Sequence, residues 1–213
     1  WEADSYTPPF YRGKALYTYQ GVVRIVAVPE FIDLEGKKLS ADTLVYTWKE
    51  KGQVAGDASG YGRRIFSIKG GIPFRPTIIS VEVSTVDKQM IAESSIELEP
   101  GGPEVILYGE APLEGILFNK ALNGKSSFIG SELGIVAIPY FFSATTPTAR
   151  DLVYKWNMNG FTLESFTGNN LTLKQGNVDG QSSIGVEVRS EANMFQFASN
   201  GTSVVLGKEQ VNF

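Results

Sequence analysis

The chain repeats one pattern twice, and this repeat constrains its fold more than any other feature. Four short segments of the first half return in the same order in the second half, 105 to 110 residues later. They are Lys14-Ala15-Leu16 with Lys120-Ala121-Leu122, Ile25-Val26-Ala27-Val28-Pro29 with Ile135-Val136-Ala137-Ile138-Pro139, Leu44-Val45-Tyr46-Thr47-Trp48 with Leu152-Val153-Tyr154-Lys155-Trp156, and Val81-Glu82-Val83 with Val186-Glu187-Val188. A drift of a few residues is typical of loop insertions between fixed strands. We therefore predict two copies of one domain, covering residues 1–100 and 101–213.

Within each half, apolar and polar residues alternate with a period of two, which predicts β-strands rather than helices. The repeated segments are strands of this kind, and further short strands are expected at 65–69, 94–99, 171–174 and 203–206. Turn-forming pairs separate them. These pairs are Glu35-Gly36, Lys51-Gly52, Gly70-Gly71, Asn159-Gly160, Asp179-Gly180 and Asn200-Gly201, and the boundary between the halves falls at Pro100-Gly101-Gly102-Pro103. Many short strands in about 105 residues predict an all-β sandwich for each half.

Composition removes several classes of function. The chain has no cysteine and no histidine, which excludes thiolate chemistry, zinc–thiolate sites and His-based catalysis. The net charge of −4 argues against a nucleic-acid surface, which needs a concentrated basic face. No apolar run reaches the ~20 residues that span a bilayer, and no signal peptide precedes Trp1, so we interpret the sequence as an internal or processed fragment.

The repeated strands carry a family resemblance. A Tyr-x-Trp strand after an Ala-x-Pro strand, followed later by Val-x-Val, resembles bacterial Ig-like domains and, among them, the polycystic-kidney-disease-type (PKD) domain. The resemblance implies that Trp48 and Trp156 occupy the centres of the two cores, together with Tyr46 and Tyr154. The PKD continuation Trp-Asp-Phe-Gly-Asp-Gly is missing, and the chain is closer to the Trp-x-x-x-Gly hairpin of general Ig-like modules. Its Pro-Pro-Phe-Tyr and Pro-Tyr-Phe-Phe-Ser segments also resemble exported proteins of candidate-phylum bacteria.

Three kinds of candidate site deserve testing. Tyr140, Phe142 and Phe161 could form an exposed aromatic platform for a sugar or a protein, or Tyr140 and Phe142 could instead cap the sandwich or fill the seam between domains. Glu97, Glu99, Glu104 and Glu110 flank the domain junction, where calcium binds in some tandem sandwiches, but no Asp-x-Asp cluster accompanies them and a solvated edge is expected. The recurring Lys14 and Lys120 could form intramolecular Lys–Asn bonds or be ordinary surface lysines.

Together these observations predict two tandem Ig-like or PKD-like β-sandwiches in an end-to-end arrangement. The expected role is a non-catalytic, structural or adhesive module of an extracellular or cell-surface bacterial protein. Other modules of that protein, or extracellular proteins or glycans, are the expected partners, and no catalytic residue, cofactor or metal is assigned. The alternative is a carbohydrate- or protein-binding module that uses loop aromatics, possibly as an accessory to a larger secreted enzyme.

Overall fold

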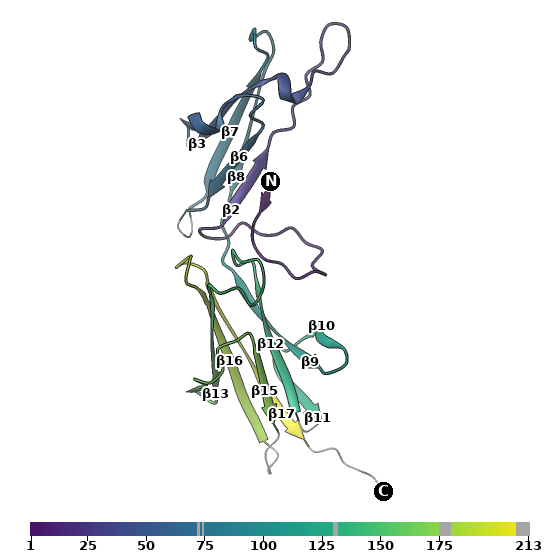
Figure 1. The fold of residues 1–213 in the computed structure, drawn as a ribbon, viewed down its shortest axis with the longest axis vertical. Helices are drawn as coiled ribbons and strands as arrows, with labels where there is room; N and C mark the ends of the chain where they lie inside the picture. The colour runs from purple at the N-terminus through teal and green to yellow at the C-terminus, as the bar shows by residue number, and fades with distance from the viewer. Residues whose placement is uncertain (72, 74, 130–131, 175–179, 208–213) are drawn as a thin grey trace. The chain divides into compact units, whose positions relative to one another are not determined.

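The chain folds into two compact units whose division differs slightly from the predicted one. A computed structural model describes residues 1–71, 73, 75–129, 132–174 and 180–207 (Figure 1). The first unit consists of Trp1–Asp4 and Lys14–Gly101, and the second of Ser5–Gly13 and Gly102–Phe213. The predicted boundary near residue 100 therefore lies within two residues of the observed one. The prediction that residues 1–100 form one uninterrupted domain is wrong, because Ser5–Gly13, which we call the strap, packs with the second unit.

The first unit is a sandwich of two antiparallel sheets. One sheet has the order β1 (Glu2–Ala3), β2 (Val22–Val26), β6 (Ile65–Lys69). The other has the order β4 (Gln53–Val54), β3 (Val45–Glu50), β7 (Thr77–Ser84), β8 (Ile91–Leu98), and β5 (Gly60–Tyr61) also pairs with β3. Two 3₁₀ turns, η1 (Ala41–Thr43) and η2 (Gly56–Ala58), connect strands of this unit. No helix within the described residues is long and apolar enough to cross a membrane.

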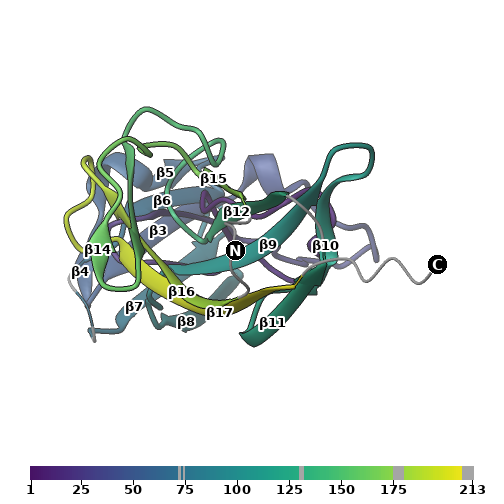
Figure 2. The same cartoon turned by 90° about the horizontal axis from the view of Figure 1, so that it is seen from below.

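The second unit repeats this plan with longer strands. One sheet has the order β10 (Gly115–Ala121), β9 (Glu104–Ala111), β12 (Glu132–Tyr140), β15 (Asn170–Lys174). The other has the order β11 (Gly124–Ile129), β17 (Phe197–Gly207), β16 (Gly180–Ser190), β13 (Leu152–Met158), β14 (Phe161–Thr162). Strand β11 runs parallel to β17, beside which it lies in Figure 2. In the first unit β1, β2 and β6 form one sheet. In the second unit β9, β12 and β15 follow the same order in a sheet that also contains β10. The remaining strands of each unit form the other sheet, which is the arrangement of Ig-like sandwiches.

The two units share their strand pairing as well as their strand order. Trp48 lies opposite Val81 in the first unit, and Trp156 lies opposite Val186 in the second. These partners belong to the repeated segments of the sequence, so the repeat corresponds to equivalent positions in space. Each unit also has its own buried apolar cluster, built around its own tryptophan. The chain is therefore all-β, with two Ig-like sandwiches in tandem.

The two tryptophans are held in the same way. Trp48 is 1% exposed and Trp156 is 0% exposed. The indole N–H of Trp48 donates to the carbonyl of Arg63 at 2.8 Å, and that of Trp156 donates to the carbonyl of Gly168 at 2.8 Å. The polar atom of each ring is thus paired inside the core, as a buried indole requires.

The two repeated tyrosines anchor the connection that precedes their strand. The Tyr46 hydroxyl donates to the carbonyl of Ala41 at 2.7 Å, and the Tyr154 hydroxyl donates to the carbonyl of Pro147 at 2.5 Å. Both rings are buried, and burial raises the pKa of both hydroxyls above the ordinary value for tyrosine. The tyrosines therefore stay neutral and donate a hydrogen bond at physiological pH.

The predicted turns after the tryptophan strands are present, whereas Asn200-Gly201 is not a turn, and Asp179 of the predicted Asp179-Gly180 turn lies outside the described residues. Lys51-Gly52 and Asn159-Gly160 each have positive φ at both residues and join strands by two-residue loops, as type I′ hairpins do. Asn200-Gly201, by contrast, lies inside β17. Gly201 fits there because a Cβ at this position would lie 3.1 Å from the carbonyl oxygen of Ile184 on the neighbouring strand.

Candidate functional site

The structure separates the three aromatic residues of the predicted platform. Phe161 begins β14 and is 77% exposed, whereas Tyr140 is 8% and Phe142 is 0% exposed. Tyr140 and Phe142 therefore cannot offer a ring face to a ligand, and the prediction of an exposed platform is wrong for these two residues. Of the three residues, Phe161 alone has an exposed ring that a ligand could contact.

Burial of Tyr140 follows from a strand that continues through a proline. Strand β12 includes Pro139, which lies opposite Val105 of β9, and ends only at Tyr140. At Pro139, β12 pairs with β9 alone, because its pairing with β15 covers only residues 132–136. One side of the strand therefore needs no backbone donor here, and a proline, which has no N–H, is tolerated. The residues after Pro139 consequently belong to the sheet and its continuation rather than to an exposed loop.

Tyr140 belongs to an apolar cluster on the face of β12 that points away from the sandwich core. Residues 133, 135 and 137 of this strand lie in the main core, while residues 136, 138 and 140 lie in the second cluster. Its buried members are Tyr108, Val136, Ile138, Tyr140 and Phe141. The hydroxyls of Tyr108 and Tyr140 form a hydrogen bond of 2.8 Å inside it. Burial, followed by this hydrogen bond, raises the pKa of the Tyr140 hydroxyl well above its ordinary value.

The strap covers this second cluster. The backbone N–H of Tyr6 donates to the carbonyl of Phe142, and the N–H of Phe141 donates to the carbonyl of Tyr6, both at 2.7 Å. The ring of Tyr11 stands edge-on to those of Tyr140 and Phe141, with centroid distances of 6.1 and 5.7 Å. Phe141 has a φ of 64°, a conformation that bulky residues rarely adopt, and the strap binds directly at this strained position. The strap therefore has a structural role in the second unit.

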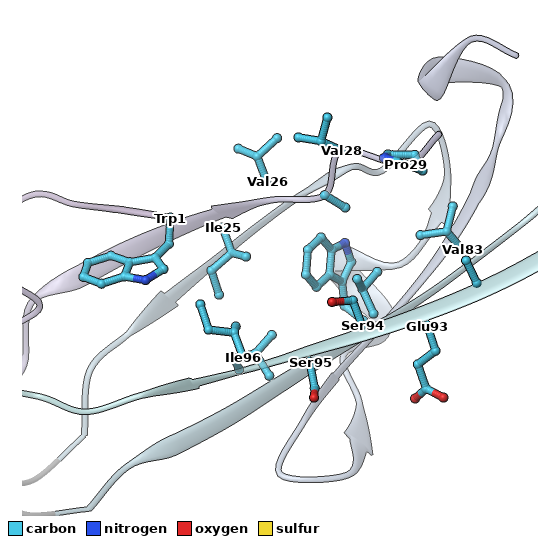
Figure 3. Close-up of a pocket in the computed structure, with 15 residues that line it drawn as sticks. Trp1, Ile25, Val26, Val28, Pro29, Val83, Glu93, Ser94, Ser95 and Ile96 are labelled. Carbon is cyan, nitrogen blue, oxygen red and sulfur yellow. The ribbon is translucent and has the colours of Figure 1, made fainter. Parts of the chain in front are cut away.

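A cleft of about 480 Å³ opens in the first unit, along the line between β2 and β8 (Figure 3). We call it the first-unit cleft. Its floor includes core residues, among them Trp48, and its rims are the edges of two different sheets. The residues that line it are Trp1, Ile25, Val26, Ala27, Val28, Pro29, Trp48, Ile79, Val81, Val83, Ala92, Glu93, Ser94, Ser95 and Ile96. Its volume lies within the usual range of ligand sites, and its lining is mainly apolar.

The electrostatics of the first-unit cleft are simple. Glu93 is its one charged lining residue, and its carboxylate lies 3.8 Å from the ammonium group of Lys49, which is also 4.0 Å from Glu82. At one end, the ring of Trp1 is covered by the ammonium group of Lys14, 3.2 Å from the ring centroid. An apolar cavity with one carboxylate at its rim can bind apolar side chains, but it contains no pair of groups arranged for acid–base catalysis.

The other candidate sites do not assemble in the described part of the chain. No group of three or more Asp or Glu side chains there could hold a metal ion, and Glu97, Glu99, Glu104 and Glu110 are all exposed. Lys14 and Lys120 are exposed as well, and Lys14 contacts Trp1, so neither is the buried amine that a Lys–Asn bond needs.

Neither the strap nor the first-unit cleft was predicted from the sequence. Tyr6, Phe10 and Tyr11 around Pro8-Pro9 were a usable indication, because three aromatic residues in an irregular segment need a surface to cover. The cleft has no local pattern, since its lining residues come from β2, β3, β7 and β8 together.

Comparisons with known proteins gave distant similarities to solved structures. Neither protein-family models nor curated protein sequences gave a match. Among solved structures, fibronectin(III)-like modules of Clostridium thermocellum CbhA are similar over 93% of this chain and 92% of theirs, with 10% identity and a TM-score of 0.31. The central fibronectin-III array of RIM-binding protein is similar over 93% of this chain and 68% of its own, with 14% identity and a TM-score of 0.33. Immunoglobulin domains 1–4 of Sidekick-1 are similar over 91% and 49%, with 15% identity and a TM-score of 0.30.

At TM-scores of 0.30–0.33 and identities of 10–15%, these similarities carry no argument about the fold or the ligands of this chain. The strand order and the repeated tryptophan cores identify the chain as a tandem pair of Ig-like β-sandwiches.

Proposed function

We propose that this chain is a non-catalytic structural and interaction module of an extracellular protein, most simply a bacterial cell-surface protein, in which it links, projects or docks other modules. The observation that supports this role most is that the residues shared by the two repeats belong to the two cores. The tryptophan and tyrosine of each copy, with the strands opposite them, are core residues with matching hydrogen bonds. Among the residues that the structure describes, no polar cluster recurs in the same way.

The chemistry of the chain supports the same role. Histidine and cysteine are absent from the sequence, and the described residues hold no acidic cluster for a metal. Each unit has its own apolar core, which provides stability without disulfides in a domain of this size. Such units suit a protein whose task is to hold other parts in place.

The proposal is tested by locating the native protein in the cells that make it. Intact cells are treated with a protease that cannot enter, and peptides of this chain are then identified in the supernatant by mass spectrometry. We expect peptides from both units to be released, or the protein to be present in the culture medium. If the peptides appear only after lysis, the extracellular assignment is wrong.

Phe161 supports a second candidate, a carbohydrate- or protein-binding module. Its ring is 77% exposed beside the Asn159-Gly160 turn, as a stacking platform for a sugar would be. We expect Phe161→Ala to abolish binding on a glycan array while leaving the melting temperature nearly unchanged. Phe197→Ala, at another exposed phenylalanine (61%), is the matched control. Unchanged glycan binding in Phe161→Ala would rule out the platform.

A further inference from the structure

A strained backbone position lies directly beneath the strap. Phe141 has a φ of 64° and is 5% exposed, and it is the only aromatic residue with a positive φ among the residues that the structure describes. A left-handed backbone is unfavourable for a bulky side chain, so contacts with the rest of the protein must hold Phe141 in it. Strained residues of this kind are common in segments that switch between two conformations.

The backbone of the strap provides a contact at this position. The N–H of Phe141 donates to the carbonyl of Tyr6, and the N–H of Tyr6 donates to the carbonyl of Phe142, both at 2.7 Å. Because both hydrogen bonds involve Tyr6, release of this one residue breaks them together. The N–H of Phe141 then loses its acceptor, and the backbone of Phe141 can return to an extended conformation, which is the favourable one for its side chain.

The far end of the strap is held by an aromatic ring that requires a glycine beside it. The ring of Tyr11 stands edge-on to those of Tyr140 and Phe141. A Cβ on Gly13 would overlap the Tyr11 ring, with the Cε1 atom only 2.8 Å away. The φ of Gly13 lies outside the left-handed region, so the nearby ring, and not the backbone, requires a glycine here. We call Tyr11 and Gly13 the latch.

Both ends of the strap are anchored away from the surface that it covers. Asp4, which precedes the strap, belongs to the first unit. Its N–H donates to the carbonyl of Val22 at 3.0 Å, and its carboxylate accepts from the N–H of Val22 at 2.8 Å. Lys14, which follows the strap, also belongs to the first unit. The strap can therefore leave its surface while both anchors and both apolar cores stay intact.

We propose that the strap is a reversible cover, and that the protein exchanges between a closed and an open state. In the closed state the strap is bound, Phe141 is strained, and the second cluster, which contains Tyr108 and Tyr140, is buried. In the open state the strap is released, Phe141 relaxes, and the second cluster meets solvent. Burial of apolar surface favours the closed state, whereas relief of strain favours the open one. This inference goes beyond the linking role proposed above and does not depend on it.

Hydrogen exchange of the full chain, followed residue by residue by NMR, measures the opening. The amides of Tyr6 and Phe141 should have equal protection, because one event exposes both, and this protection should not change in urea below the unfolding transition. The N–H of Ala137, which donates to the carbonyl of Asn169 in the same unit, should exchange at least about 100-fold more slowly. Gly13→Ala should speed exchange at Tyr6 and Phe141 by roughly tenfold and leave Ala137 unchanged.

Two controls connect this effect to the latch. Gly56 has open space where a Cβ would lie, so Gly56→Ala should leave the exchange of the strap unchanged. In a Tyr11→Ala background, Gly13→Ala should have no further effect, because the ring that a Cβ would displace is already absent.

An introduced thiol tests exposure of the second cluster independently. The chain has no cysteine, so a single substitution gives a single reactive site. Ile138 (1% exposed) lies in the second cluster, and its neighbour Ala137 (0% exposed) lies in the main core. Reaction of Ile138→Cys with a maleimide should become roughly tenfold faster when Gly13→Ala is added, whereas Ala137→Cys should react at the same rate with and without it.

Three results would overturn the inference. The first is exchange of the Tyr6 and Phe141 amides only through global unfolding, as slowly as that of Ala137. The second is an equal effect of Gly13→Ala with and without the ring of Tyr11. The third is an unchanged thiol reaction at position 138 in the presence of Gly13→Ala. None of these results bears on where the native protein is located, so failure of the cover and failure of the extracellular role are separate outcomes.

Discussion

Truncation of Trp156 tests the reasoning that each repeat carries its own core. A buried aromatic side chain removes about 150–250 Å² from water, which at roughly 25 cal/mol per Å² corresponds to about 4–6 kcal/mol as an upper estimate. Measured losses for such truncations are about 3–5 kcal/mol. Trp156 is fully buried, and its removal also leaves the Gly168 carbonyl without its donor. We therefore expect Trp156→Ala to lower the free energy of unfolding of the second unit by about 4 kcal/mol.

Urea unfolding measures this loss, and the repeat supplies its control. With a slope near 2 kcal/mol/M, the expected loss moves the midpoint of the second unit by about 2 M. Hydrogen exchange with mass spectrometry assigns each transition to its unit, and Trp48 fluorescence should report an unchanged first unit. Trp48→Ala should produce the reverse pattern. A loss below about 1 kcal/mol, or equal shifts in both units, would refute the assignment of one independent core to each repeat.

Three further predictions follow from the strap, the tyrosines and the hairpins. A protease site engineered between residues 101 and 102 should allow the chain to be cut without separation of the two fragments in gel filtration, because the strap binds the second unit. Tyr11→Ala should promote their separation, because it removes the ring that contacts Tyr140 and Phe141. Separation of fragments that carry no Tyr11 substitution would contradict this role of the strap. Burial raises the pKa of the Tyr140 hydroxyl, so its contribution to stability is complete below about pH 10 and is lost as the pH rises further. Tyr140→Phe should therefore reduce the fall of the urea unfolding midpoint with pH above about pH 10. An equally steep fall in Tyr140→Phe would contradict this pH dependence. Lys51 (φ 50°) occupies the turn position where Asn159 (φ 51°) stands in the other unit. Lys51→Asn should therefore raise the free energy of unfolding of its unit, and Asn159→Lys should lower that of the other unit, by about 0.5–1 kcal/mol each. The two melting temperatures should shift in opposite directions in thermal unfolding, and shifts of the same sign would contradict this reasoning.

The sequence predicted the parts of the fold that alternate and repeat. Strand β6 has the bounds expected from alternation, and the partners of Trp48 and Trp156 are the repeated Val-x-Val segments. These predictions succeed because period-two burial and a repeated core leave little freedom in the pairing of strands. The turn residues after each tryptophan were equally predictable, since positive φ favours Gly and Asn.

The pairing and burial of the residues near the first strand of each sandwich could not be predicted from the sequence. The repeat is weak there: Lys14-Ala15-Leu16 and its copy differ in structure, since Leu16 is 41% exposed and Leu122 is 7% exposed. Within the described residues, β1 has two residues where its counterpart β9 has eight. Tyr140 is buried because β12 continues through Pro139, which pairing on one side only allows. Features that depend on a distant segment leave no local pattern.

The strap is synthesised well before the surface to which it binds. Its aromatic side chains emerge from the ribosome about 130 residues before Tyr140 and Phe141, which they contact. At roughly 5–20 residues per second, this delay is on the order of 10 s. During that interval the first unit can acquire its core while a nascent loop rich in tyrosine and phenylalanine remains without its binding surface. The strap can therefore bind its surface only after all residues of the first unit have been synthesised.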